Sequence, residues 1–179
     1  MAPQDLHNKL HDEPFKPFID NLRAAGIATV IASGNDGSTN QLSAPACVSS
    51  AVSVGATTKD DRVADYSNVA PFLSLFAPGD EIISLYPGES FTVASGTSMA
   101  APHVAGTAAL MLSLAPNASS ATIESVLDRT TTEIDLPGWD YYSGWGMVDA
   151  LNAARTIAPS AFGLTPQPPP VVRRRSTKS

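Results

Sequence analysis

Gly96-Thr-Ser-Met-Ala-Ala-Pro-His-Val-Ala-Gly106 opens the longest helical segment of the chain and decides how the fold is interpreted. An Ala-, Met- and Leu-rich pattern predicts a helix over 97–115, with Ser98 at its start. The unpaired N–H groups and the positive dipole end of a helix N-terminus stabilise a developing negative charge. Ser and Thr are also the usual N-terminal caps, so spacing alone leaves a simple capping role open.

The segments around this helix predict a mainly parallel sheet. Apolar residues at helical spacing over 14–26 lead directly into the run 28–32, whose composition is typical of a strand buried on both faces. A helix that leads into such a strand is half of a βαβ unit, which indicates the α/β class. Further strands are expected over 51–56, 72–77, 81–86 and 91–94, and further helices over 119–129 and 147–157.

Length and composition are those of one globular domain with a polar segment at each end. The 179 residues are 43% hydrophobic and 16% charged. We expect a polar N-terminal segment over 1–13, a domain over 14–160, and a Pro-rich basic tail over 161–179. Four prolines between 166 and 170 and the arginines at 173–175 predict that this tail is disordered and dispensable for catalysis.

Charge and hydropathy exclude several classes of partner. The formal net charge of −6 gives the chain no electrostatic footprint for nucleic acid. No apolar stretch approaches the roughly 20 residues needed to cross a bilayer, so no membrane span is expected. Cys47 is the single cysteine and cannot form an internal disulfide. The first ten residues lack the basic start and apolar run of a signal peptide.

The segment 96–106 resembles the nucleophile motif of subtilisin-like serine proteases over eleven contiguous residues. The resemblance implies a three-layer α/β sandwich with a mainly parallel sheet, in which Ser98 attacks the scissile carbonyl. It also implies that Gly96 allows close approach of the substrate backbone. Small Ala100 and Ala101 would let the helix pack tightly, and Pro102 lies near the first turn, where a missing N–H costs little.

A second segment, Ala32-Ser-Gly-Asn-Asp-Gly37, is similar to the family stretch whose Asn side chain donates to the oxyanion. A plain Gly-Asn-Asp-Gly turn would explain the same letters, but the segment lies about 60 residues before Ser98, as in the family. The resemblance implies that Asn35 and the Ser98 N–H form the oxyanion hole. It places Ser33 and Gly34 in one wall of the substrate pocket and Asp36 at its rim, where polar or basic side chains would be favoured.

Other segments extend the resemblance over about residues 14 to 158. Ser43-Ala-Pro-Ala46 and the strand at 51–56 are similar to the stretch beyond the substrate pocket, and Tyr142 to Ala150 resembles the closure before the last helix. The family often has an acidic calcium ligand three residues before its Ala-Pro-Gly, where this sequence has Ser74. No metal site is therefore assigned. Asn117-Ala-Ser119 is a formal glycosylation sequon, but a cap or turn explains it better.

The base of the expected triad is the main departure from the family pattern. A subtilisin-like triad runs Asp, His, Ser, with His roughly 150 residues before Ser, whereas 97 residues precede Ser98 here. We expect the matching Asp and His in an N-terminal part that precedes Met1. His7 and His11 have the spacing of a helical pair, but the residues around them do not match the histidine segment of the family. Two interpretations remain for this pair: a metal-binding site or two solvated surface side chains. His103 lies five residues from Ser98, about 500° of helical rotation, so the two side chains point roughly 140° apart.

These observations predict a serine endopeptidase that works through an acyl-enzyme as part of a longer parent chain. The family resemblance implies a peptide or protein substrate and an extracellular parent. The partner of this chain would be the missing N-terminal half of the catalytic domain, without which we expect the chain to be inactive and unstable. The alternative is an inactive fragment, or a remnant that binds a peptide or a partner protein.

Overall fold

The structure, a computed structural model, describes residues 14–134, 140 and 142–164. Three parallel strands form its sheet in the order β1 (Val30–Ala32), β2 (Val52–Thr57) and β3 (Leu75–Pro78). Val30 pairs with Val52, and Val54 pairs with Leu75. The α/β class and the parallel sheet are therefore confirmed.

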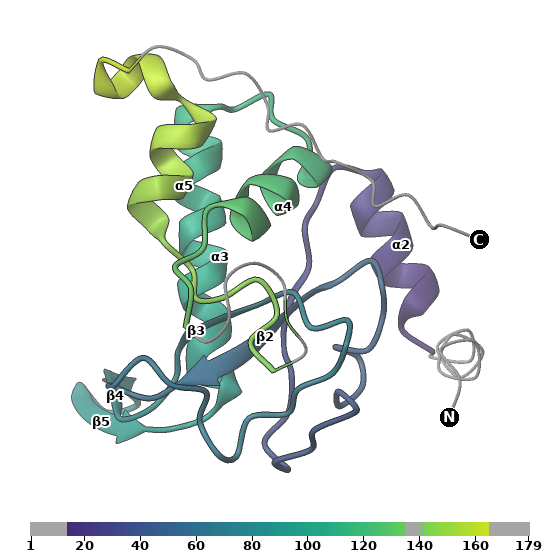
Figure 1. Cartoon of the computed structure of the whole chain (residues 1–179), viewed down its shortest axis with the longest axis vertical. Helices are drawn as coiled ribbons and strands as arrows, with labels where there is room; N and C mark the ends of the chain where they lie inside the picture. Colours follow the sequence, from purple (N-terminus) through teal and green to yellow (C-terminus); the bar gives the residue numbers. More distant parts are fainter. Residues whose placement is uncertain (1–13, 135–139, 141, 165–179) are drawn as a thin grey trace.

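One long helix covers a face of this sheet (Figure 1). Helix α3 (Thr97–Leu114) contacts all three strands, and α4 (Ser120–Arg129) and α5 (Ala150–Ile157) pack against α3. The short 3-10 helix η2 (Pro159–Phe162) follows α5. The core between sheet and helices contains mainly small and medium apolar residues, among them Val54, Leu75, Ala100, Val104 and Met111.

The opposite face of the sheet is covered by loops. Phe76 of β3 is fully buried there among residues of the segments that precede β2 and β3, including Leu42, Ala46, Val69 and Leu73. Helix α2 (Lys16–Ala24) contributes Ile19 to a small cluster with Val48 and Ala51. The sheet is thus a middle layer between helices and loops, and β2 is buried along its whole length.

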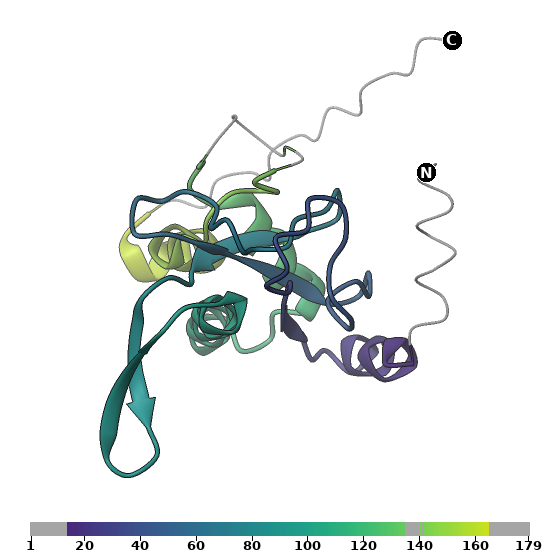
Figure 2. The same cartoon turned by 90° about the horizontal axis from the view of Figure 1, so that it is seen from below.

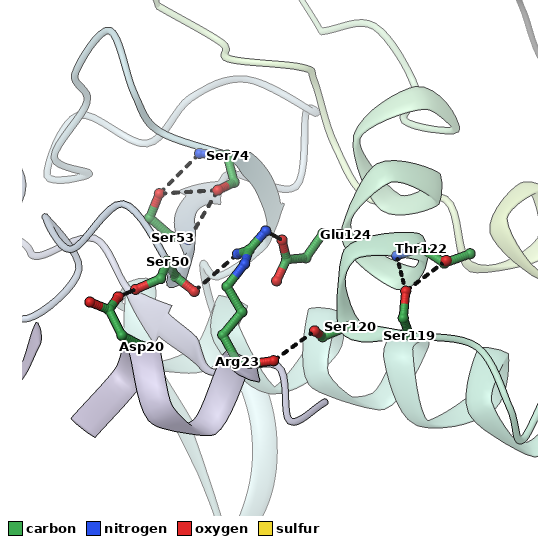
Figure 3. Close-up of polar contacts among 9 residues, drawn as sticks. All are labelled: Asp20, Arg23, Ser50, Ser53, Ser74, Ser119, Ser120, Thr122 and Glu124. Carbon is green, nitrogen blue, oxygen red and sulfur yellow. Dashed lines mark hydrogen bonds and ion pairs between the residues drawn. The ribbon is translucent and has the colours of Figure 1, made fainter. Parts of the chain in front are cut away.

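Helix α2 is joined to α4 by polar contacts of Arg23 (Figure 3). Its guanidinium forms an ion pair of 2.5 Å with Glu124 and donates to the Ser50 carbonyl oxygen at 3.2 Å. The Ser120 hydroxyl donates to the Arg23 carbonyl oxygen at 3.4 Å. Burial raises the pKa of Glu124, while Arg23 opposes that rise. Burial, followed by the nearby charge of Glu124, raises the pKa of Asp128 to about 7.

The predicted strand 28–32 is shorter and less buried than its composition indicates. The strand begins at Val30, and all three of its residues are only partly buried. Side chains of β1 pack on both faces, Val30 on the core with α3 and Ile31 on the loop side, but the full burial that was predicted is not reached in the described residues. There β1 is an edge strand, and only β2 pairs with it. An edge strand leaves one row of backbone N–H and C=O groups without a neighbouring strand.

The strands predicted at 81–86 and 91–94 pair with each other outside the parallel sheet. They are β4 (Ile82–Tyr86) and β5 (Ser90–Ala94), and they form an antiparallel hairpin. Figure 2 shows this hairpin projecting away from the body of the chain. Its cross-strand pairs Ile83–Val93 and Leu85–Phe91 place four apolar side chains on one exposed face.

Two other predicted boundaries were wrong for local reasons. The strand expected at 72–77 begins only at Leu75, because the preceding residues form a turn in which the Leu73 N–H bonds to the Ala70 carbonyl. The helix expected from 147 begins at Ala150, because the Asp149 side chain caps it by accepting from the Asn152 N–H at 2.8 Å. The residues before this cap continue the sheet instead, and Val148 N–H donates to the Phe76 carbonyl.

Some predictions concern residues outside the described part of the chain. These are the polar segment 1–13 with His7 and His11, and the part of the predicted tail from residue 165 onward. Among the helices that the structure does describe, none has the length and apolar character to cross a membrane.

Candidate active site

The site residues gather at the carboxyl end of the sheet, where α/β proteins bind their ligands. The segment 33–37 leaves β1 at this end, and Gly79 follows β3. The Gly96 N–H donates to the Gly79 carbonyl at 2.8 Å, which fixes the start of α3 against the sheet. The two segments selected from the sequence, 32–37 and 96–106, therefore meet.

Asn35 contacts the first residue of α3. Its Oδ1 accepts hydrogen bonds from both the N–H and the hydroxyl of Thr97, each at 2.9 Å. Because a backbone N–H only donates, the oxygen of the amide must face Thr97. The NH₂ group is left as a donor, and it lies on the side of Gly96, within 3.4 Å of where a Cβ on Gly96 would stand.

Ser98 is the second residue of α3, and its side chain is exposed. Its N–H belongs to the first turn of α3, where N–H groups have no partner inside the helix. No described residue hydrogen-bonds to its hydroxyl. The side chain borders an open hollow of about 320 Å³ at the base of the hairpin. The other residues around this hollow are Ile82, Ile83, Ser84, Met99, Pro102 and His103.

His103 is not hydrogen-bonded to Ser98 in this structure. The two side chains border the same hollow, but the Nδ1 atom of His103 is hydrogen-bonded to the carbonyl oxygen of Met99 at 2.9 Å, one turn earlier in α3. Among the described residues, Ser98 therefore has no base within hydrogen-bonding distance.

Asp36 borders a second, polar hollow of about 230 Å³. Its Oδ2 accepts from the hydroxyl of Ser43 and from the amide Nδ2 of Asn68, each at 3.1 Å. These two donors direct the exposed carboxylate toward the hollow. The remaining residues around it are Ser38, Gln41 and Leu42.

Comparison with known proteins identifies the family. The model of the subtilase family (Peptidase_S8) matches residues 3–146, which is most of the chain. The chain belongs to the subtilase family.

Several subtilisins are similar to this subtilase over the same region. Subtilisin DY of Bacillus licheniformis is 38% identical over 143 residues, which are 78% of this chain and 51% of that protein. Subtilisin NAT of Bacillus subtilis subsp. natto is 37% identical over 143 residues, 78% of this chain and 37% of the relative. Subtilisin-like protease 6 of Trichophyton verrucosum is 39% identical over 116 residues, 65% of this chain and 28% of the relative. The chain thus spans about half or less of the length of these relatives.

The structure brings part of the predicted site of this subtilase together: Gly34 and Asn35 meet the start of α3, whereas Asp36 borders the separate polar hollow. Gly34 joins the segment 33–37 to α3, because its N–H donates to the Thr97 hydroxyl at 3.2 Å. Its φ of +110° and the side chains of Ser43 and Asn68, which leave no room for a Cβ, require glycine here. Ser33 is fully buried, so its side chain does not reach the surface of either hollow.

Two residues of the site were missed in the sequence. The sequence motif assigns Thr97 no role of its own, yet its hydroxyl joins Gly34 to Asn35. No motif includes Asn68, which is only 1% exposed and contacts most of the loop that carries Asn35. A polar residue directly before the apolar pair Val69 and Ala70 was the available signal for Asn68.

Ser74, at which the sequence assigned no calcium ligand, is hydrogen-bonded to Ser53 (Figure 3). Its hydroxyl accepts from the Ser53 N–H at 3.2 Å, and its own N–H donates to the Ser53 hydroxyl at 3.0 Å. These bonds join β2 to the start of β3. In the described part of the chain, no three His, Cys, Asp or Glu side chains come together as a group that could hold a metal ion.

Proposed function

We propose that this chain is the nucleophile-bearing part of a subtilisin-like serine endopeptidase, with Ser98 as the nucleophile. Three features support the proposal: membership of the subtilase family, the exposed Ser98 at a helix N-terminus, and the amide of Asn35, which is bonded to the preceding residue Thr97. The second of these features does not fit an ordinary cap, because Gly96 is the N-cap of α3 and Ser98 is the second residue inside the helix. The orientation of the Asn35 amide is the observation that carries the proposal.

The Asn35 amide supports an oxyanion hole because its orientation is fixed before any substrate binds. Two bonds from Thr97 hold its oxygen, so the NH₂ group needs no reorganisation to donate to negative charge near Ser98. The Ser98 N–H and the positive end of the α3 dipole would add to the same field. Donors that are preorganised in this way act most strongly on charge that exists only in the transition state.

The proposed reaction is acyl transfer in two steps. The Ser98 hydroxyl attacks the scissile carbonyl carbon while a base takes its proton, and the carbonyl electron pair moves onto oxygen at Asn35. Collapse of this intermediate breaks the C–N bond, and the base returns its proton to the leaving amine. Water then hydrolyses the acyl-enzyme by the same route.

The base and its acidic partner come, in this proposal, from a polypeptide segment outside this sequence. Ser98 has no basic partner among the described residues, and a serine hydroxyl without a base is a weak nucleophile. Helix α3 supports an additional segment independently. Apolar residues occur on all its sides, which is typical of a helix buried all round, yet Leu110 is 56% exposed. We propose that the same segment covers this surface and the free edge of β1.

The proposed substrate is a peptide or protein. Gly96 and Gly34 would lie beside its backbone, Ser33 would support the pocket wall from beneath, and Asp36 at the second hollow would favour polar or basic side chains before the cut. By family resemblance we propose that the parent acts outside the cell. The proposal assigns no cofactor and no calcium site.

Substitution of Asn35 by leucine in the complete protein tests the proposal. Leucine is close in size to asparagine but donates no hydrogen bond, so kcat should fall more than KM rises. Removal of one oxyanion-hole donor lowers kcat by about 10²–10³-fold in a subtilisin, the case from which this magnitude comes. Ser98→Ala should reduce activity at least as far. A raised KM with unchanged kcat would show that Asn35 is instead a turn or binding residue.

The alternative function is a peptide-binding remnant without catalysis. The absence of a base near Ser98 among the described residues is the observation that favours it. Binding of peptides by the complete protein, without hydrolysis in wild type or in Ser98→Ala, would support this alternative over the peptidase.

A further inference from the structure

We propose that Asn68 is a positioning residue for the peptidase reaction: it holds the loop 33–38 so that the Asn35 amide faces Ser98. The inference rests on the proposed function of this site and names a residue through which it is assembled. Asn68 lies between β2 and β3 in sequence, 33 residues after Asn35. It is buried beneath the loop with only 1% of its surface exposed.

The amide of Asn68 uses both of its ends on the loop. Its Oδ1 accepts from the N–H groups of Asp36 and Ser38, each at 2.9 Å. Its Nδ2 donates to the Asp36 carboxylate and the Ser43 hydroxyl at 3.1 Å, and more weakly to the Ser33 carbonyl at 3.4 Å. The two N–H donors fix which end of the amide is oxygen, so this orientation is determined by chemistry.

The loop is thereby held from two sides. From below, the Asn68 N–H donates to the Gly34 carbonyl at 3.0 Å and its side chain binds the residues that follow Asn35. From the side of α3, Thr97 binds the Gly34 N–H and the Asn35 Oδ1. Asn35 is exposed, and its amide oxygen is held by Thr97. Loss of the Asn68 side-chain bonds would leave the loop with fewer anchors, such as the Gly37 N–H bond to the Tyr66 carbonyl, and would let the Asn35 amide shift away from Ser98.

The pairing of Asn68 with Asp36 allows a test that separates positioning from packing. Asn68→Asp keeps the size of the side chain and an acceptor for the N–H groups of Asp36 and Ser38. It replaces the Nδ2 donor by a second carboxylate facing that of Asp36, which is a repulsive contact. Adding Asp36→Asn reverses the pair, so that an amide at 36 again donates to an acceptor at 68.

The experiment measures kcat and KM of the complete protein on a peptide with an uncharged residue before the cut. Asn68→Asp should lower kcat roughly ten- to hundredfold, the effect expected from the loss of one or two buried hydrogen bonds. The double variant with Asp36→Asn should recover kcat to within about threefold of wild type, because the bond between the side chains at positions 36 and 68 is restored. The control Asn40→Ala removes an exposed amide two residues beyond this loop, which accepts a long bond of 3.4 Å from the Ser38 hydroxyl, and should leave both constants unchanged. Unchanged kcat in Asn68→Asp, or no recovery in the double variant, overturns the proposal.

Hydrogen exchange supplies a readout that does not require activity. In Asn68→Ala, the N–H groups of Asp36 and Ser38 lose their acceptor and should exchange at least about tenfold faster, while those in the middle of α3 keep their wild-type rates. Unchanged exchange at Asp36 and Ser38 overturns the positioning role. If the wild-type protein hydrolyses no peptide, the proposed function fails, and exchange at these two positions still decides whether Asn68 holds the loop.

Discussion

Thr97→Val is the substitution that most directly tests how the Asn35 amide is held. Valine has nearly the shape of threonine, but it lacks the hydroxyl that donates to Asn35 Oδ1 at 2.9 Å and accepts from the Gly34 N–H at 3.2 Å. The backbone N–H of residue 97 remains and still donates to Asn35. The change therefore weakens the anchor of the amide without removing it.

The size of the effect follows from those contacts. Thr97 is fully buried, so the N–H of Gly34 loses its partner at a cost of about 1–3 kcal/mol. The lost bond to Asn35 adds about 0.5–1.5 kcal/mol, and a water molecule that bonds to the exposed Asn35 Oδ1 would reduce this cost. We expect the free energy of unfolding to fall by roughly 2–3 kcal/mol. That corresponds to a decrease in Tm of about 5–10 °C for a domain of this size.

Peptide hydrolysis and thermal unfolding of the complete protein measure the two effects. The looser amide should reduce kcat about tenfold with little change in KM, because the oxyanion exists only in the transition state. Thr97→Ser keeps the hydroxyl and should stay within about threefold of the wild-type kcat. If Thr97→Val equals wild type in both kcat and Tm, the hydroxyl does not hold Asn35 and the geometry inferred for the oxyanion hole is wrong.

Three further predictions concern stability and association. Gly34→Ala should prevent folding or lower the Tm by more than about 10 °C in thermal unfolding. The Cβ of the alanine would overlap Asn68, and the φ of +110° at this position is strained for any residue with a Cβ. The pKa of Asp128 is raised from 3.8 to about 7, so the unfolded state loses this proton first and the free energy of unfolding should fall as pH rises from about 4 to 7. Asp128→Asn should remove that dependence and stabilise the protein by roughly 2–4 kcal/mol at pH 8 in urea unfolding, whereas a wild-type slope in the variant would contradict the cause given. Residues 1–179 expressed alone should associate or unfold, since Leu110 and the edge of β1 are exposed. A chain that is monomeric by sedimentation and melts sharply and cooperatively by circular dichroism would count against the proposed additional segment.

The parts of the fold that could be predicted from sequence are those where one local signal dominates. Helix α3 was predicted to within one residue of its end, because an uninterrupted Ala- and Leu-rich pattern is closed by Pro116. The start of α4 was predicted from Ser119, which caps the helix by accepting from the Thr122 N–H at 3.1 Å. In both cases the deciding atoms lie within a few residues of one another.

The parts that failed depend on which segments become neighbours. The composition of 28–32 indicates burial but cannot show that β1 has a strand on one side only in this chain. The hairpin was predicted as strands, yet nothing in their composition separates a projecting hairpin from an inner pair.

In the candidate site, too, local patterns could be predicted from the sequence and contacts between distant segments could not. Its two segments were identified from sequence, and the structure brings them together, but their roles remain predictions. Asn68 contacts Asp36 across 32 residues, and Thr97 contacts Asn35 across 62. Such contacts leave no periodic trace in the sequence, so both residues were found only in the structure.

Reaction of Ser98 with a fluorophosphonate probe is the most direct measurement of the proposed chemistry. The probe is to be added to this chain alone and to the complete protein, and the modified serine located by mass spectrometry of the peptide that contains residues 96–106. We expect rapid stoichiometric labelling of Ser98 in the complete protein and almost none in the chain alone, because none of the described residues supplies a base to the hydroxyl. Rapid labelling of the chain alone, or no labelling of Ser98 in the complete protein, would contradict the proposal.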